Sequence, residues 1–183
     1  MRLSLAMVVR NEEARIREAI LDIGPHVNEI VLVDQASTDS TKYIARELVD
    51  HIIEHPAYGF SEASRAEAIS SCMGDWVLLL DADERLTDFG KVWIRRWINA
   101  EYADFYNLRR LTRIDGEIIE DMLHPRLFRR GYVKSPSSLH TLCLPVYGAR
   151  IHSVLTSVAI EHDKTGTEQQ ADDLRYEGLR QIG

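Results

Sequence analysis

Apolar strands alternate with helical segments through the first 80 residues of the chain, and this alternation limits the fold more than any other feature. The strand-like runs 3–9, 29–33 and 76–80 are almost continuously apolar. Strands of this kind are buried on both faces, which occurs mainly in parallel sheets covered by helices. We therefore predict an α/β fold with a Rossmann-like, mostly parallel central sheet flanked by helices.

The helices are expected between these strands. Asn11 has the chemistry of an N-cap, and the following apolar residues recur at helical spacing as far as Gly24-Pro25. Further helices are expected at 44–49 and 61–72, with a weak strand at 51–54. The third helix offers three residues for its inner face, namely Ala66, Ile69 and Cys72.

The second half of the chain has a different pattern. A helix is expected at 91–98 and another at 168–182. Asp115-Gly116 lies between two strand-like runs, which predicts a β-hairpin. Short strand-like runs follow at 126–128, 132–133 and 153–160. We expect them to add antiparallel strands to the parallel core.

Composition excludes some classes of protein. The chain has 183 residues and a formal net charge of −7, which argues against a protein that coats nucleic acid. Its two cysteines, Cys72 and Cys143, lack zinc-site spacing and are typical of a reducing compartment. No run approaches the roughly 20 apolar residues of a membrane span. We expect a soluble, cytoplasmic protein without a nucleic-acid partner.

Carboxylates gather where two of the expected strands end. Asp34 follows one apolar run, while Asp81, Asp83 and Glu84 follow another. In open parallel sheets, ligands bind beyond the carboxyl ends of the strands. Carboxylate oxygens suit Mg²⁺ or Mn²⁺, which often keep only one or two protein ligands and take the rest from water and phosphates. Asp-x-Asp alone is also compatible with a helix cap or a solvated loop.

Three segments in register resemble the inverting family 2 glycosyltransferases with the GT-A fold. They are MVVRNEEARIREAI, IVLVDQASTDSTKYIA and SEASRAEAISSCMGDWVLLLDADE. Gln35 and Ala36 depart from the Asp and Gly that are usual in the second segment. Later, DMLHPRLFRRG, LHT and AIEH resemble the subgroup that includes lipopolysaccharide-core glucosyltransferases, although Thr141 stands where Glu is usual. The resemblance implies a single domain over 1–183, with a nucleotide-sugar half (1–90) and an acceptor and catalytic half (91–183).

The resemblance also implies roles for individual residues. A nucleoside-diphosphate sugar, most naturally a UDP-sugar, would be the donor, and a saccharide or glycolipid hydroxyl the acceptor. Asp83, Asp81 and His140 would hold Mn²⁺ or Mg²⁺, and Asp121, or failing it Glu120, would act as the catalytic base. The implied nucleotide-sugar site consists of Val9, Arg10, Asn11, Glu12, Asp34, Arg65, Asp81 and Ala82.

Other functions stay open at this stage. A nucleotidyltransferase would use a similar sheet, but it would typically open with a Gly-rich loop that VVRNEEAR lacks. A degenerate domain could bind the nucleotide sugar without transferring it. Peripheral contact with a membrane is a further alternative for an enzyme that acts on a glycolipid.

Overall fold

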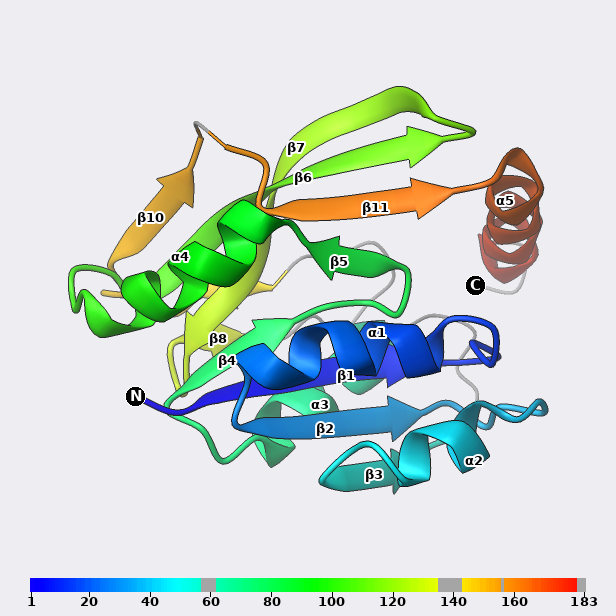
Figure 1. Ribbon diagram of the computed structural model, residues 1–183, viewed down its shortest axis with the longest axis horizontal. Coiled ribbons are helices and arrows are strands. Elements are labelled where there is room, and N and C mark those ends of the chain that lie inside the picture. Colours follow the sequence, from blue (N-terminus) through cyan, green and yellow to red (C-terminus); the bar gives the residue numbers. More distant parts are fainter. Residues whose placement is uncertain (57–61, 135–142, 156, 181–183) are drawn as a thin grey trace.

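The computed structural model describes residues 1–56, 62–134, 143–155 and 157–180. Within these residues, nine strands form one sheet in the order β3-β2-β1-β4-β7-β6-β11-β5, with β10 also paired to β6 (Figure 1). The strands of the first half are β1 (Leu3–Val9), β2 (Glu29–Asp34), β3 (His51–Glu54), β4 (Trp76–Leu79) and β5 (Glu84–Leu86). Those of the second half are β6 (Phe105–Ile114), β7 (Glu117–Arg129), β10 (Ile151–Val154) and β11 (Ile160–Lys164). A separate two-stranded sheet consists of β8 (Val133–Lys134) and β9 (Leu144–Pro145).

Helices cover both faces of the large sheet. They are α1 (Ile16–Ile23), α2 (Thr41–Arg46), α3 (Glu62–Ser71), α4 (Asp88–Asn99) and α5 (Gly166–Arg180), with a short 3-10 turn at Gly24–His26. In Figure 1, α1 and α4 lie in front of the sheet, α3 lies behind it, and α5 follows the end of β11. Within the described part of the chain, no helix has the length and apolar character needed to cross a bilayer.

The parallel core is confirmed. Strands β3, β2, β1 and β4 all run parallel, and β7 is antiparallel to both β4 and β6. The expectation of added antiparallel strands is confirmed for 126–128, which belongs to β7, but it was wrong for 153–160. Strands β10 and β11 run parallel to β6, and among their pairings only β11–β5 is antiparallel. A two-residue turn forces antiparallel pairing, whereas the long connection that follows β7 allows the chain to return in the direction of β6.

The sheet separates two apolar layers. On one face, α1 packs through its buried isoleucines and α4 through Ile94, Trp97 and Ile98. On the other face, Ala68, Ile69 and Cys72 pack against strands β1, β2 and β4. The inner face of α3 was thus assigned partly wrongly, since Ala66 is exposed and Ala68 takes its place.

Two turns show how local sequence sets the geometry. Asp115 and Gly116 both have positive φ, 50° and 86°, which confirms the hairpin and suits a type I′ turn. Asn11 also has positive φ, 57°, and it does not cap a helix, because α1 begins only at Ile16. The Asn11 Oδ1 atom instead accepts a hydrogen bond from the Thr38 backbone N–H at 2.8 Å. The expected cap is therefore replaced by a bond that joins two loops at one edge of the sheet.

Candidate active site at the carboxyl edge of the sheet

The carboxyl ends of β2, β1 and β4 meet at one edge. Val9 pairs with Asp34, and Ala6 pairs with Leu79, so the residues after each strand end lie close together. This arrangement confirms that Asp34 and Asp81 share an edge. The side chains of Val9 and Ala82, by contrast, are buried, with 3% exposure each, and Val9 belongs to the apolar core.

Asp34 has an unusual hydrogen-bond environment for a buried carboxylate. The residue is 2% exposed. Its Oδ2 atom accepts the backbone N–H of Ser37 at 3.0 Å, whereas its Oδ1 atom is buried and has no hydrogen-bond partner among the described residues. A buried acceptor without a donor is costly, and most such groups in proteins are satisfied. The free oxygen is therefore a candidate contact for an N–H group of a ligand.

Asp81 is held by arginines. Arg65 donates two hydrogen bonds to it, at 3.1 and 2.9 Å, and Arg126 lies 3.3 Å from its Oδ2 atom. Burial raises the pKa of Asp81, but the two guanidinium groups more than offset this effect and hold it below its ordinary value. The buried Glu84 carboxylate continues the network, because its Oε1 atom accepts from both Arg126 and Arg110.

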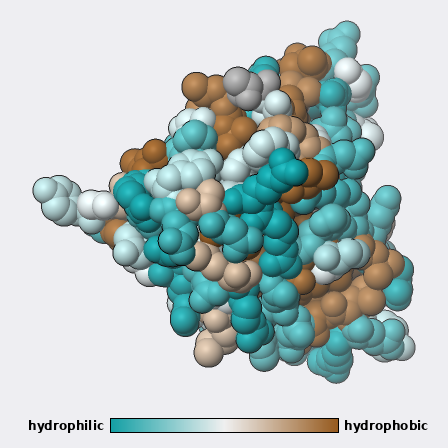
Figure 2. All heavy atoms as spheres, turned by 60° about the vertical axis from the view of Figure 1, so that its left-hand side comes forward, coloured by the Kyte–Doolittle hydropathy of each residue, from teal (hydrophilic) through white to brown (hydrophobic). Residues whose placement is uncertain are grey.

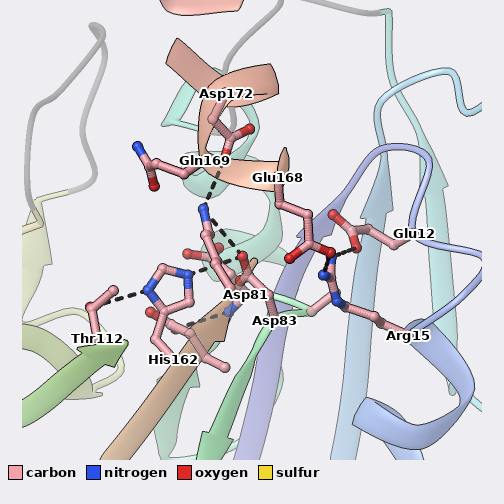
Figure 3. Close-up of polar contacts among 12 residues, drawn as sticks. Glu12, Arg15, Asp81, Asp83, Thr112, His162, Glu168, Gln169 and Asp172 are labelled. Atoms are coloured by element: carbon pink, nitrogen blue, oxygen red, sulfur yellow. Dashed lines mark hydrogen bonds and ion pairs between the residues drawn. The ribbon is translucent and has the colours of Figure 1, made fainter. Parts of the chain in front are cut away.

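Asp83 faces a histidine and a lysine. The His162 Nε2 atom lies 3.0 Å from its Oδ2 atom (Figure 3). The Lys164 Nζ atom lies 3.5 Å from the same oxygen. Burial raises the pKa of Asp83, but the contact with His162 and the charge of Lys164 hold it well below its ordinary value. Asp83 is therefore an anion whose contacts come from β11, across the sheet from β4.

Ion pairs made by the first two turns of helix α5 attach this helix to the sheet edge. Lys164 donates to Asp172 at 2.7 Å, and Arg15 forms an ion pair with Glu168 (Figure 3). The Glu12 Oε2 atom lies 3.7 Å from the Arg15 Nη1 atom. Burial, followed by the negative charge of Asp83, raises the pKa of Glu12 to about 7. The edge thus combines buried and half-buried acids with cations that bridge between them.

The two candidate bases lie on opposite faces of the β6–β7 hairpin. Asp121 forms two hydrogen bonds with Arg109, at 2.7 and 2.6 Å, on the face that also carries Leu123. The Glu120 carboxylate accepts a hydrogen bond from Arg110 and another from the Thr112 hydroxyl, which is 3.1 Å away. Glu120 is therefore linked to the Glu84 network, whereas Asp121 is not part of it.

His140, and not His162, was the expected histidine ligand of the metal ion. His140 lies outside the described residues. His162 lies against Asp83 because β11 pairs with both β6 and β5, and the register places His162 opposite Thr112 and Glu84. The segment AIEH was the available signal, but only the strand register identifies the partner. Among the residues that the structure describes, no three His, Cys, Asp or Glu side chains converge closely enough to hold a metal ion by themselves.

An apolar pocket lies on the Asp121 face of the hairpin. Its volume is about 280 Å³, and its lining includes Asn107, Leu123, Cys143, Leu144 and Ile151. Leu144 and Ile151 are exposed at 60% and 55%, respectively. Figure 2 brings the left-hand side of Figure 1 forward and shows apolar side chains there in separate groups among polar ones. Burial raises the pKa of the Cys143 thiol, and the nearby charges of Arg65 and Arg126 oppose this rise, so one wall of the pocket lies near the Asp81 network.

The first half of the chain has relatives. Residues 4–91 match the family model of glycosyl transferase family 2. This family 2 region carries β1 to β5, and therefore Asp34, Asp81 and Asp83. An uncharacterized glycosyltransferase of Rickettsia typhi is 40% identical over 86 residues, which is 47% of this chain and 29% of that protein. A TPR repeat-containing protein of Synechococcus elongatus is 34% identical over 126 residues, which is 69% of this chain and 31% of that protein. The chain spans less than a third of the length of either relative.

Solved structures resemble the chain well beyond the family 2 region. TarS of S. aureus (residues 1–349), in complex with UDP-GlcNAc, superposes with a TM-score of 0.70 at 17% identity and covers 90% of this chain and 59% of that one. The mannosyltransferase PcManGT of Pyrobaculum calidifontis, in complex with GDP-Man and Mn²⁺, gives a TM-score of 0.51 at 20% identity, covering 58% and 35%. At such identities the likeness shows the fold alone, and it confirms the GT-A architecture. The lipopolysaccharide-core subgroup stays a prediction.

Proposed function

We propose that this chain is a glycosyltransferase domain that transfers a hexose from a nucleoside-diphosphate sugar to a saccharide hydroxyl, with inversion and with a divalent metal ion. One observation carries the proposal: the buried Asp34 Oδ1 atom has no hydrogen-bond donor among the residues that the structure describes, and it lies at the edge where open parallel sheets bind their ligands. The N–H group of uracil would supply the donor, which favours a UDP-sugar. The family 2 match and the UDP-GlcNAc bound by TarS support this choice.

The donor set at Asp83 fits a metal ion of the Mn²⁺ or Mg²⁺ type. Asp83 provides an anionic oxygen and His162 an imidazole nitrogen, 3.0 Å apart. Two protein ligands suffice for such ions when water and phosphates complete the shell. Asp81 fits less well, because its oxygens already accept from Arg65 and Arg126. The bound ion would act as a Lewis acid and stabilise charge on the departing nucleoside diphosphate.

The chain's own residues would bind and orient the substrates. Lys164, close to Asp83, is placed to contact an anionic diphosphate, and Arg65 holds Asp81 in a fixed orientation. We propose Asp121 as the base that accepts the acceptor proton, since it lies on the face of the hairpin that carries the pocket. Arg109 holds the pKa of Asp121 below its ordinary value, so its carboxylate is ionised at neutral pH. The pocket itself would hold part of the acceptor, and a membrane-held glycolipid is one acceptor with an apolar portion.

A donor screen tests the proposal. UDP-, GDP- and dTDP-sugars are incubated with the protein and Mn²⁺, and the released nucleoside diphosphate is measured. We expect release from UDP-sugars, its loss with EDTA, and its loss in Asp83→Ala but not in the control Asp173→Ala, which removes an exposed carboxylate of α5. Release that continues in EDTA or in Asp83→Ala would contradict the metal site.

Two further measurements separate the alternatives. A nucleotidyltransferase would release pyrophosphate from a nucleoside triphosphate in the presence of a sugar phosphate. A domain that only binds the donor would show UDP binding by calorimetry without turnover of any sugar nucleotide. We place the enzyme in the cytoplasm, and its two free, buried cysteines support a reducing compartment.

A further inference from the structure

Four strands place a row of side chains beside Asp83. Glu120 on β7 pairs with Thr112 on β6, Thr112 pairs with His162 on β11, and His162 pairs with Glu84 on β5. The side chains of the first three are also hydrogen-bonded in this order. The Thr112 Oγ1 atom lies 3.1 Å from the Glu120 Oε2 atom and 3.2 Å from the His162 Nδ1 atom. The row ends at Asp83, 3.0 Å from the His162 Nε2 atom (Figure 3).

Counting protons along the row fixes the roles of donors and acceptors. The Glu120 Oε2 atom also accepts from the Arg110 guanidinium group, so it is a carboxylate oxygen that can only accept. A threonine hydroxyl has one hydrogen, and the geometry assigns that hydrogen to Glu120. The remaining lone pairs of the hydroxyl face the Nδ1 atom of His162. A hydrogen bond at that contact therefore requires a hydrogen on Nδ1.

The neutral ring with its hydrogen on Nδ1 has a lone pair on Nε2. An Nε2–H group would donate to the Asp83 Oδ2 atom, 3.0 Å away, whereas this lone pair and Oδ2 together offer two acceptor atoms to a divalent cation. Metal-binding histidines commonly donate their second N–H group to a neighbouring acceptor, which fixes the tautomer and the orientation of the ring. Thr112 is such an acceptor, and Glu120 in turn orients the Thr112 hydroxyl.

We infer that Thr112 and Glu120 are positioning residues that hold His162 in the tautomer that binds a divalent cation together with Asp83. This inference rests on the proposed function, because it assumes a cation at Asp83. It gives Glu120 a role distinct from that of a catalytic base. It also explains why a polar, 4% exposed threonine occupies the middle of this strand row.

The test measures Mn²⁺ affinity directly, through the electron paramagnetic resonance signal of free Mn²⁺ during titration of the full chain. Thr112→Val keeps the shape of the side chain and removes the hydroxyl, and we expect it to weaken Mn²⁺ binding by about 10- to 100-fold. Thr112→Ser restores the hydroxyl and should bind within about twofold of the wild type. In a His162→Ala background, Thr112→Val should have no further effect, since the ring through which it acts is gone.

A second variant covers the case in which Thr112→Val does not fold. Glu120→Ala removes the acceptor of the Thr112 hydrogen and lets that hydrogen turn toward Nδ1, so we expect Mn²⁺ affinity to fall about 10-fold. A residue that served only as a base would leave metal affinity unchanged. Spin-echo modulation from a coordinated ¹⁴N atom should be present in the wild type and absent in His162→Ala.

The outcomes separate the inference from the function on which it rests. Wild-type protein that binds Mn²⁺ through Asp83 and His162, combined with unchanged affinity in Thr112→Val or in Glu120→Ala, would overturn the inference alone. Wild-type protein whose Mn²⁺ binding is insensitive to Asp83→Ala would overturn both the inference and the proposed metal site.

Discussion

Replacing Glu12 by Gln should make the protein more stable at alkaline pH and leave it unchanged at acidic pH. Burial, together with Asp83 and then Asp81 and Asp172, raises the pKa of Glu12 from its ordinary value of 4.5 to about 7, while Arg15 opposes the change. Between these two values the native protein keeps the Glu12 proton and the unfolded chain loses it. The contribution of Glu12 to the free energy of unfolding is therefore complete below pH 4.5, and it decreases as the pH rises to about 7.

The magnitude follows from the width of this pH range. Each pH unit in which only the unfolded chain is ionised lowers the free energy of unfolding by about 1.4 kcal/mol. Over the range from 4.5 to about 7, wild-type protein loses about 3 kcal/mol that Glu12→Gln does not lose. The variant should equal the wild type near pH 4 and exceed its free energy of unfolding by about 3 kcal/mol at pH 8.

Urea unfolding at several pH values, in EDTA, measures this difference. Glu18→Gln on the exposed side of α1 is the matched control and should give a difference that does not change with pH. A Glu12→Gln difference that is the same at pH 4 and pH 8 would refute the reasoning, as would a variant that is less stable at pH 8.

Two further substitutions test the packing around the site. Glu84→Ala leaves the half-buried Arg110 and the buried Arg126 without their shared carboxylate, and we expect the free energy of unfolding to fall by about 3–5 kcal/mol in urea titrations. A loss below about 1 kcal/mol would show that the pairs contribute little. Tyr106→Phe removes a buried hydrogen bond, 2.9 Å long, to the Trp97 carbonyl, and it should lower the free energy of unfolding by about 1 kcal/mol. An unchanged unfolding midpoint would contradict this prediction.

Sequence reasoning located the parallel core and its functional edge because both depend on local pattern. Continuous apolar runs identified β1, β2 and β4. Asp34 ends β2 and Asp81 lies two residues after β4, so both acids lie where such strands end. Asp115-Gly116 likewise has a local preference for positive φ, which the hairpin uses.

The remaining errors concern contacts between distant segments. Asn11 has the side chain of a helix cap, but its bond to Thr38, 27 residues away, fixes it in another conformation. His162 contacts Asp83 across 79 residues, and only the register of β11 brings the two together. The direction of β10 and β11 is set in the same way, by a long connection instead of a tight turn. A single sequence contains no local signal for any of these contacts.

The attachment of α5 offers a way to detect a ligand at the sheet edge. Arg15 and Lys164 hold the start of this helix through Glu168 and Asp172, and both cations also neighbour the acids of the sheet edge. An anion that draws either cation toward itself weakens that attachment, and the coupling is equal in both directions. A fluorescent label on an exposed position of α5, such as Asp173, would therefore report occupancy of the edge without any need for turnover.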